Sequence, residues 1–200
     1  MNIILLNKRL LFLPFLICFI PILSAQNAKS DKKNFAVSAE FGSGYIANID
    51  LEKSFSENIF FSPSVRLLWK PNHKLNIGVE SAYLTVSKLD STLQSTSFGS
   101  TMLKARLNAI PLLLVFNMKI AKIDLYYGIG VSYVTSRLQA FDEKVVVSNW
   151  YYCYDLALAY NHPLSKNIDI GIESKTFFFP KLQKVSSGLT INISYRFLRW

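Results

Sequence analysis

The chain has 200 residues, 50% of them hydrophobic, and its 22 basic and 13 acidic residues give a formal net charge of +9. Beyond residue 25, the longest unbroken apolar run is AIPLLLVF, residues 109 to 116, which falls short of the roughly 20 residues that a transmembrane helix needs. Cys153 is the only cysteine in that part of the chain, which excludes an intramolecular disulfide and leaves packing and strand pairing to stabilise the fold.

The N-terminus carries the features of a secretory signal peptide. A basic pair, Lys8 and Arg9, precedes an apolar run over residues 10–23 and two small residues, so we expect cleavage after Ala25. The alternative, an anchor helix, is disfavoured because the run is short and contains two prolines. The sequence therefore predicts a signal peptide over residues 1–25 and one domain over residues 26–200. For an exported basic domain, lipid phosphates are more plausible partners than nucleic acid.

Apolar and polar residues alternate in eight segments of this domain. In the last segment, GLTINISYRF, the apolar residues Leu189, Ile191 and Ile193 alternate with Thr190 and Asn192. Strict alternation is typical of a strand, since successive side chains point to opposite faces. In chain order, the predicted strands cover about residues 34–45, 58–69, 75–87, 103–120, 123–135, 149–160, 167–178 and 188–197.

The segment 103–120 changes phase part of the way along. Its apolar residues are odd-numbered up to Leu107 and even-numbered from Leu112 onward. We expect a β-bulge at Pro111, which cannot donate a ladder hydrogen bond, and therefore expect Arg106 and Lys119 to lie on the same polar face.

The connections between predicted strands alternate in length. The sequences KPNHK, IAKI and NHPLSKN form short turns after the second, fourth and sixth strands. Longer links, SKLDSTLQSTSFGST and RLQAFDEKVVVS, follow the third and fifth, and IANIDLEKSFSEN follows the first. Short periplasmic turns that alternate with longer outer loops are typical of outer-membrane barrels, so both termini would lie on the periplasmic side.

The polar face carries charges in nearly every strand, and two environments fit such a pattern. In a soluble barrel these charges would face water, whereas in a membrane barrel they would pair inside a narrow lumen. The aromatic residues favour the membrane, because Tyr and Trp prefer its interfaces and here gather near strand ends: Tyr45, Trp69, Tyr83, Tyr133, Trp150, Tyr151, Tyr160 and Tyr195. The candidates for lumen ion pairs are Glu40, Arg66, Glu80, Arg106, Lys119, Asp124, Asp155, Asp169, Glu173, Lys175 and Arg196. We expect Arg196 to pair with Glu173 and, across the closure of the barrel, with Glu40.

Several stretches resemble the small outer-membrane β-barrel proteins of Gram-negative bacteria, of the OmpA-like or PorT-like type: RLLWKPNHKLNIGVESAY, AIPLLLVFNMKI, LYYGIGVSYVTSRL and the terminal ISYRF. The resemblance covers about residues 35–197. It implies an all-β fold, an eight-stranded antiparallel up-and-down transmembrane β-barrel in contact with outer-membrane lipids. It also implies a terminal aromatic signal for the barrel-assembly machinery, with Tyr195 and Phe197 as candidates, although three residues follow Phe197.

The sequence offers little support for catalysis. Both histidines, His73 and His162, fall in predicted periplasmic turns, Cys153 has no partner at metal-ligand spacing, and YYGIGVSY lacks the features of a phosphate-binding loop. We therefore expect no cofactor and no enzyme, but a structural or interaction protein whose outer loops, especially residues 87–102, contact a protein partner that the sequence does not name. The alternatives are a narrow channel for small solutes and a lipid-modifying enzyme.

Overall fold

The computed structural model describes residues 36–50, 59–71, 75–95, 99–140 and 143–199. The predicted signal peptide, His73 and Trp200 lie outside these residues. The strands are β1 (Ala36–Asp50), β2 (Ile59–Lys70), β3 (Leu75–Ala82), β4 (Leu84–Ser95), β5 (Gly99–Ile120), β6 (Ile123–Ala140), β7 (Glu143–Pro163), β8 (Ile168–Phe179) and β9 (Lys184–Arg199), with a short 3-10 helix, η2 (Pro180–Leu182), between the last two. Among the described residues, no helix has the length and apolar character needed to cross a membrane.

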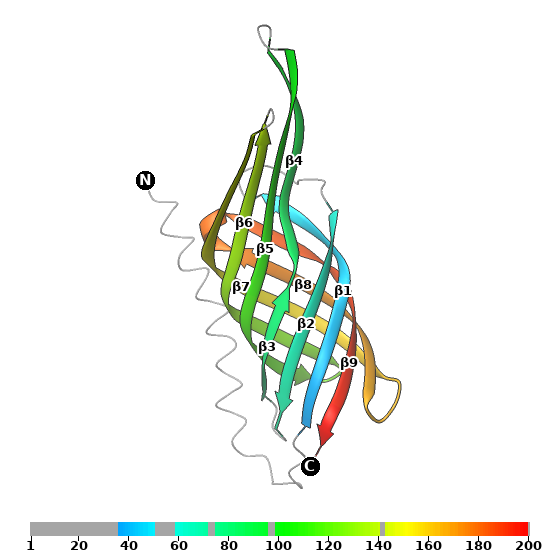
Figure 1. The fold of residues 1–200 in the computed structure, drawn as a ribbon. Helices are drawn as coiled ribbons and strands as arrows, with labels where there is room; N and C mark the ends of the chain where they lie inside the picture. Colours follow the sequence, from blue (N-terminus) through cyan, green and yellow to red (C-terminus); the bar gives the residue numbers. More distant parts are fainter. Residues whose placement is uncertain (1–35, 51–58, 72–74, 96–98, 141–142, 200) are drawn as a thin grey trace, which may run out of the picture. The chain divides into compact units, whose positions relative to one another are not determined.

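The strands form one closed antiparallel barrel (Figure 1). Apart from β3 and β4, which both pair with β5, consecutive strands pair with each other, and the last strand β9 pairs with β1. Because β3 and β4 are two halves of one strand interrupted at Tyr83, the nine segments make eight strands around the barrel. The fold predicted from the sequence, an all-β, eight-stranded antiparallel up-and-down barrel, is thus confirmed.

The interruption at Tyr83 lies between two prolines of the neighbouring strands. Pairing with β5 stops at Ser81, opposite Leu112, and resumes at Leu84, opposite Ala109, so the gap falls beside Pro111, which has no N–H to donate. On the other side, the backbone N–H of Tyr83 donates to the carbonyl oxygen of Pro63 at 2.9 Å. The strand therefore breaks where its β5 neighbour cannot complete the ladder.

The predicted bulge at Pro111 is wrong. Pairing of β5 with β6 runs from Lys104 to Ile120 without a register shift, and the irregularity lies instead in β4, between Thr85 and Ser87. A single alternation therefore holds along β5, in which Leu113 is buried and Leu114 exposed.

The continuous alternation of β5 moves one predicted lumen residue to the other face. Arg106 lies on the same side of β5 as the exposed Leu112 and Leu114, and so points outward rather than into the barrel. Lys119 remains on the inward side, as predicted, but is exposed near the end of its strand. The apolar residues before Pro111 suggested a phase slip because Leu107 and Ala109 face inward and pack with the apolar cluster inside the barrel.

Four strands continue beyond the others at the end opposite the short turns (Figure 1). Strand β7 pairs with β8 only between Tyr154 and Pro163, while its residues 143–153 pair with β6 alone. On the far side, residues 85–95 of β4 pair with β5. Most of the two stretches predicted as long links, 87–101 and 137–148, is therefore paired strand. Likewise, residues 46–50 of the first predicted loop belong to β1 and pair with β9.

The outward side of the barrel is apolar on every strand. The exposed residues there include Phe41, Val65, Leu67, Val79, Leu112, Leu114, Ile129, Leu156, Leu158, Ile172, Ile191 and Ile193. Of the aromatic residues expected near strand ends, all are exposed except Tyr151, which packs against the interior. Inside, Leu68, Leu113, Val115, Phe177 and Phe179 form part of an apolar cluster that packs beside the buried charged residues.

Candidate functional site

The charged residues inside the barrel converge on one guanidinium group, that of Arg66 on β2. Its Nε donates to Oε2 of Glu80 at 2.6 Å, and its Nη1 donates to Oε2 of Glu40 at 3.0 Å. Nη1 and Nη2 also donate to the two oxygens of Glu173, at 3.1 and 3.0 Å. One side chain thus binds carboxylates from β1, β3 and β8. Because guanidinium has five donors in a planar fork, it suits this role where an ammonium group would not.

Two further side chains complete this interior cluster. The Nζ of Lys175 on β8 forms ion pairs with Glu80 and, at 2.7 Å, with Glu173. Tyr126 on β6 lies against the guanidinium, with 3.9 Å from the Arg66 Cζ to its ring centroid, and its hydroxyl donates to Glu40 at 3.4 Å. We call Glu40, Arg66, Glu80, Tyr126, Glu173 and Lys175 the interior network.

The network is close to electrically balanced and almost fully buried. Its three carboxylates face two buried cations, Arg66 and Lys175, and the partly exposed Lys70 adds a third, with its Nζ 3.3 Å from Glu40. The exposed fractions of the Arg66 and Glu80 side chains are 4% and 0%. Unpaired charges at such burial would cost several kcal/mol each, so mutual pairing is the condition for placing them there.

The space beside the network is close to filled. A cavity of about 10 Å³ remains among residues that include Glu40, Arg66, Glu173 and Lys175. That volume holds about one water molecule. An eight-stranded barrel is just narrow enough for side chains to fill it, and the packing at this level agrees with that expectation.

Arg196 and Asp124 make their contacts outside the network. Arg196 pairs with Asp169, with 2.8 Å from Nη2 to Oδ1, and not with Glu173 or Glu40 as expected. Both glutamates are engaged by Arg66 instead. The register sets Thr190 opposite Glu173, six positions from Arg196 along β9, so that pair is too far apart. Asp124 accepts a hydrogen bond from Asn161 at 2.9 Å.

Asp155 is buried without a hydrogen-bond partner for either carboxylate oxygen among the described residues.

The structure also shows where the other groups considered for catalysis or metal binding lie. Cys153 is a free, buried thiol, and His162 is exposed. Within the described part of the chain, no three His, Cys, Asp or Glu residues are arranged to hold a metal ion.

Sequence reasoning missed Tyr126, Lys70 and Asn192, whose Nδ2 donates to Glu173 at 3.3 Å. Tyr126 lies between Asp124 and Gly128 in the inward phase of β6, and that phase was the available signal. An aromatic ring was expected only on the outward side, yet here it provides a face for the guanidinium.

The outward-facing aromatic candidates for the terminal signal, Tyr195 and Phe197, are both exposed on β9. Phe197 lies at a register shift, because Val37 pairs with Leu198 and Ser38 with Arg196. The terminal residues after Phe197 therefore continue the strand, with Leu198 and Arg199 still paired to β1.

Comparison with solved structures identifies the architecture. The chain is similar to Ail, the attachment invasion locus protein of Yersinia pestis (TM-score 0.51, 11% identity, 84% of this chain and 100% of that chain covered). It is also similar to Neisserial surface protein A (0.51, 14%, 82% and 97%) and to a major outer membrane protein from Thermus thermophilus (0.54, 12%, 82% and 99%). No protein-family profile matches the chain, and no curated protein matches its sequence. At such identities the likeness concerns the fold, so the chain has the fold of small outer-membrane β-barrel proteins.

Proposed function

We propose that the chain is an integral outer-membrane protein with a structural or interaction role, whose lumen is closed by side chains. The observation that carries this proposal is the inverted distribution of polarity: apolar side chains are exposed on all eight strands, while Arg66, Lys175 and five carboxylates are buried. A soluble barrel would have the opposite arrangement, since an exposed apolar belt of this extent favours aggregation in water. Lipid would cover the apolar outward face, and closure of the barrel leaves few backbone N–H and C=O groups without a hydrogen-bond partner.

The finer family assignment, to OmpA-like or PorT-like barrels, remains part of the proposal. So do export by a signal peptide over residues 1–25, and recognition of Tyr195 or Phe197 by the barrel-assembly machinery. Their support is the sequence pattern and, for the last, the outward exposure of both aromatic side chains.

The interior network argues for a closed lumen over a channel. A conducting path would have to cross the level at which Arg66 binds carboxylates from three strands and only about 10 Å³ is left open. Opening it would separate several buried ion pairs at once, at a cost of several kcal/mol each. We therefore favour a structural or interaction role, with partner contact through the projecting part of β4–β7.

We also propose that the protein is not an enzyme. In the described part of the chain, the thiol of Cys153 and the imidazole of His162 do not meet, since the first is buried and the second lies exposed at the far end of β7. Nucleophilic catalysis needs a nucleophile and base within hydrogen-bond reach.

Refolding tests the proposal. The protein is expected to fold in detergent or lipid vesicles, with heat-modifiable mobility on gels, and to fail to give a monodisperse folded state in plain buffer. A folded, monodisperse protein in buffer alone would overturn membrane insertion. Separately, bilayers containing the folded protein are expected to show no steady current, and a stable conductance would replace the closed lumen with the channel alternative.

A further inference from the structure

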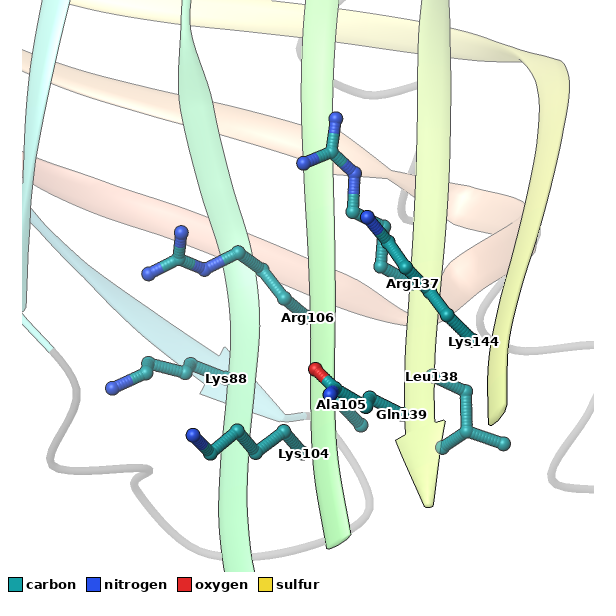
Figure 2. Close-up of a pocket in the computed structure, with 8 residues that line it drawn as sticks. All are labelled: Lys88, Lys104, Ala105, Arg106, Arg137, Leu138, Gln139 and Lys144. Carbon is teal, nitrogen blue, oxygen red and sulfur yellow. The ribbon is translucent and has the colours of Figure 1, made fainter. Parts of the chain in front are cut away.

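The projecting part of the barrel wall carries a cluster of cations. Lys88 of β4, Lys104 and Arg106 of β5, Arg137 of β6 and Lys144 of β7 line a surface hollow of about 310 Å³ (Figure 2). We call these five residues the basic cluster. Four consecutive strands contribute to it, although its members are spread over residues 88–144.

Strand register places the cluster on the outward face. Arg106 pairs with both Lys88 and Arg137, so these three form one row across β4, β5 and β6. Lys104 pairs with Gln139, and Gln139 with Lys144, which makes a second row farther from the barrel. Paired residues of neighbouring strands point to the same side. Along β5 and β6, that side is the one that carries Leu112, Leu114, Ile129 and Tyr133.

The cluster begins just past the apolar surface. On β6, Arg137 is four positions beyond the exposed Tyr133, whose ring contacts that of Trp150 on β7 at 5.2 Å between centroids. Four residues of strand span about 13 Å, or about 10 Å along the membrane normal at the usual tilt of such strands. Aromatic rings of this kind mark the headgroup level of a membrane. Because Arg and Lys side chains can bend toward an interface, the first row can reach that level.

We propose that the basic cluster binds anionic, phosphate-bearing headgroups of the outer leaflet. This inference rests on the proposed function, because it requires the apolar belt to be surrounded by lipid. The outward face of these four strands bears no carboxylate among the side chains that the structure describes. The backbone register does place Asp90 beside Lys104, so Arg106 and Arg137 of the first row carry the greater part of the attraction.

The position of the cluster favours a lipid over a soluble polyanion. The cations continue the lipid-facing surface of β5–β7, at the level where phosphates of bound lipids would lie. Binding of a soluble polyanion would not require the cations to adjoin the lipid-facing surface. The headgroup assignment therefore predicts enrichment of anionic lipid around one end of the barrel and on one side of it.

Tryptophan quenching can measure that local enrichment. With Trp69 and Trp200 replaced by Phe, Trp150 reports on lipid beside the cluster, since it is exposed on the outward face of β7. With Trp150 and Trp200 replaced, Trp69 reports on the opposite end, where it is exposed near the end of β2. The protein is refolded into phosphatidylcholine vesicles that contain brominated phosphatidylglycerol or brominated phosphatidylcholine. Heat-modifiable mobility in the plain vesicles establishes insertion before any lipid preference is measured.

The expected result is a preference for the anionic lipid at Trp150 of at least about fivefold, the scale of one basic side chain near an anionic surface. Trp69 should show no comparable preference. Replacement of Arg106 and Arg137 by Gln should abolish the preference at Trp150, whereas Arg106→Lys with Arg137→Lys should keep it. The matched control is Lys122→Gln with Lys166→Gln, which removes two exposed cations from the short turns and should change nothing.

A salt series on the unmodified cluster makes the test independent of the variants. The preference should decline from about 0.1 M to about 1 M salt, over which the Debye length falls from about 10 Å to about 3 Å. Equal quenching by both lipids, or a preference that survives loss of Arg106 and Arg137, would overturn the proposal. So would saturable binding of heparin without any lipid preference, which would assign the cluster to a soluble polyanion. In all these cases an inserted, heat-modifiable protein would leave the proposed function intact.

Discussion

Replacement of Arg66 by Met is the most demanding test of the interior network. The change keeps an apolar stem of similar length but removes four hydrogen bonds to Glu40, Glu80 and Glu173 and the contact with the ring of Tyr126. Three buried carboxylates would then share Lys175 and the partly exposed Lys70. Removal of one partner from a buried ion-pair cluster typically costs about 3–5 kcal/mol, since the remaining charges keep their desolvation penalty.

Reversible urea unfolding in lipid vesicles, followed by intrinsic fluorescence, gives the free energy of unfolding. With a urea dependence of about 2 kcal/mol per molar, a loss of about 4 kcal/mol lowers the midpoint by about 2 M. The matched control is Arg196→Met. Its ion pair with Asp169 is partly exposed, at 29% and 17% for the two side chains, so a loss of about 1 kcal/mol or less is expected.

A second substitution separates loss of charge balance from loss of packing. Adding Glu80→Gln to Arg66→Met removes one of the surplus carboxylates, so the double variant should be more stable than Arg66→Met alone. Independent sites would instead give additive losses. Equal midpoints for Arg66→Met and Arg196→Met, or simple additivity in the double variant, would refute a desolvated network and indicate a water-filled lumen.

Three other substitutions probe the barrel wall and its interior. Leu114→Arg places a charge in the middle of the outward face and should cost about 2–4 kcal/mol in vesicles, whereas Leu164→Arg, in a turn, should leave the urea midpoint unchanged. Gly44→Ala adds a Cβ that would lie 2.1 Å from a carbonyl oxygen of β9, so we expect the free energy of unfolding to fall by about 1–3 kcal/mol. The fall should be larger than for Gly128→Ala, whose Cβ would meet only side chains. Asp155→Asn removes a buried carboxylate without hydrogen bonds and should raise the free energy of unfolding by about 1–3 kcal/mol; a lower urea midpoint would show that the charge of Asp155 is useful to the network.

Periodicity was sufficient to predict the barrel. Outside β5, the phase of the strands follows directly from alternation, so the inward positions of Glu40, Arg66, Glu80 and Glu173 could be assigned before their contacts were known. Alternation has no information about register, however, and a shift of two residues keeps every side chain on its face. For this reason the inward phase of Arg196 was predicted while its partner was not.

The error at Pro111 has a different origin. Alternation was interpreted as apolar outward and polar inward along the whole strand, but apolar groups such as Ala109, Leu113 and Phe177 also pack inside the barrel. Where the inward and outward sides of a strand are both apolar, alternation no longer shows which residues face the lumen. The basic cluster was missed for a related reason: residues 87–101 and 137–148 are rich in polar residues, which favoured loops. Most of these residues form paired strands instead, and the pairing aligns their cations with those of β5.

The contact between Arg66 and Glu173 joins residues 107 positions apart. Neither can be neutralised by the other until the chain has emerged through β8 and the first and last strands have come together. Until then, the early hairpin of β1 and β2 carries Arg66 with Glu40, and the late hairpin of β8 and β9 carries Glu173 with Lys175. A half-inserted sheet would leave Arg66 without its two hydrogen bonds to Glu173 and would expose these charged side chains to the lipid interior. Closure of the barrel completes the pairing of Arg66 and buries these groups, which disfavours partly assembled intermediates and favours cooperative insertion.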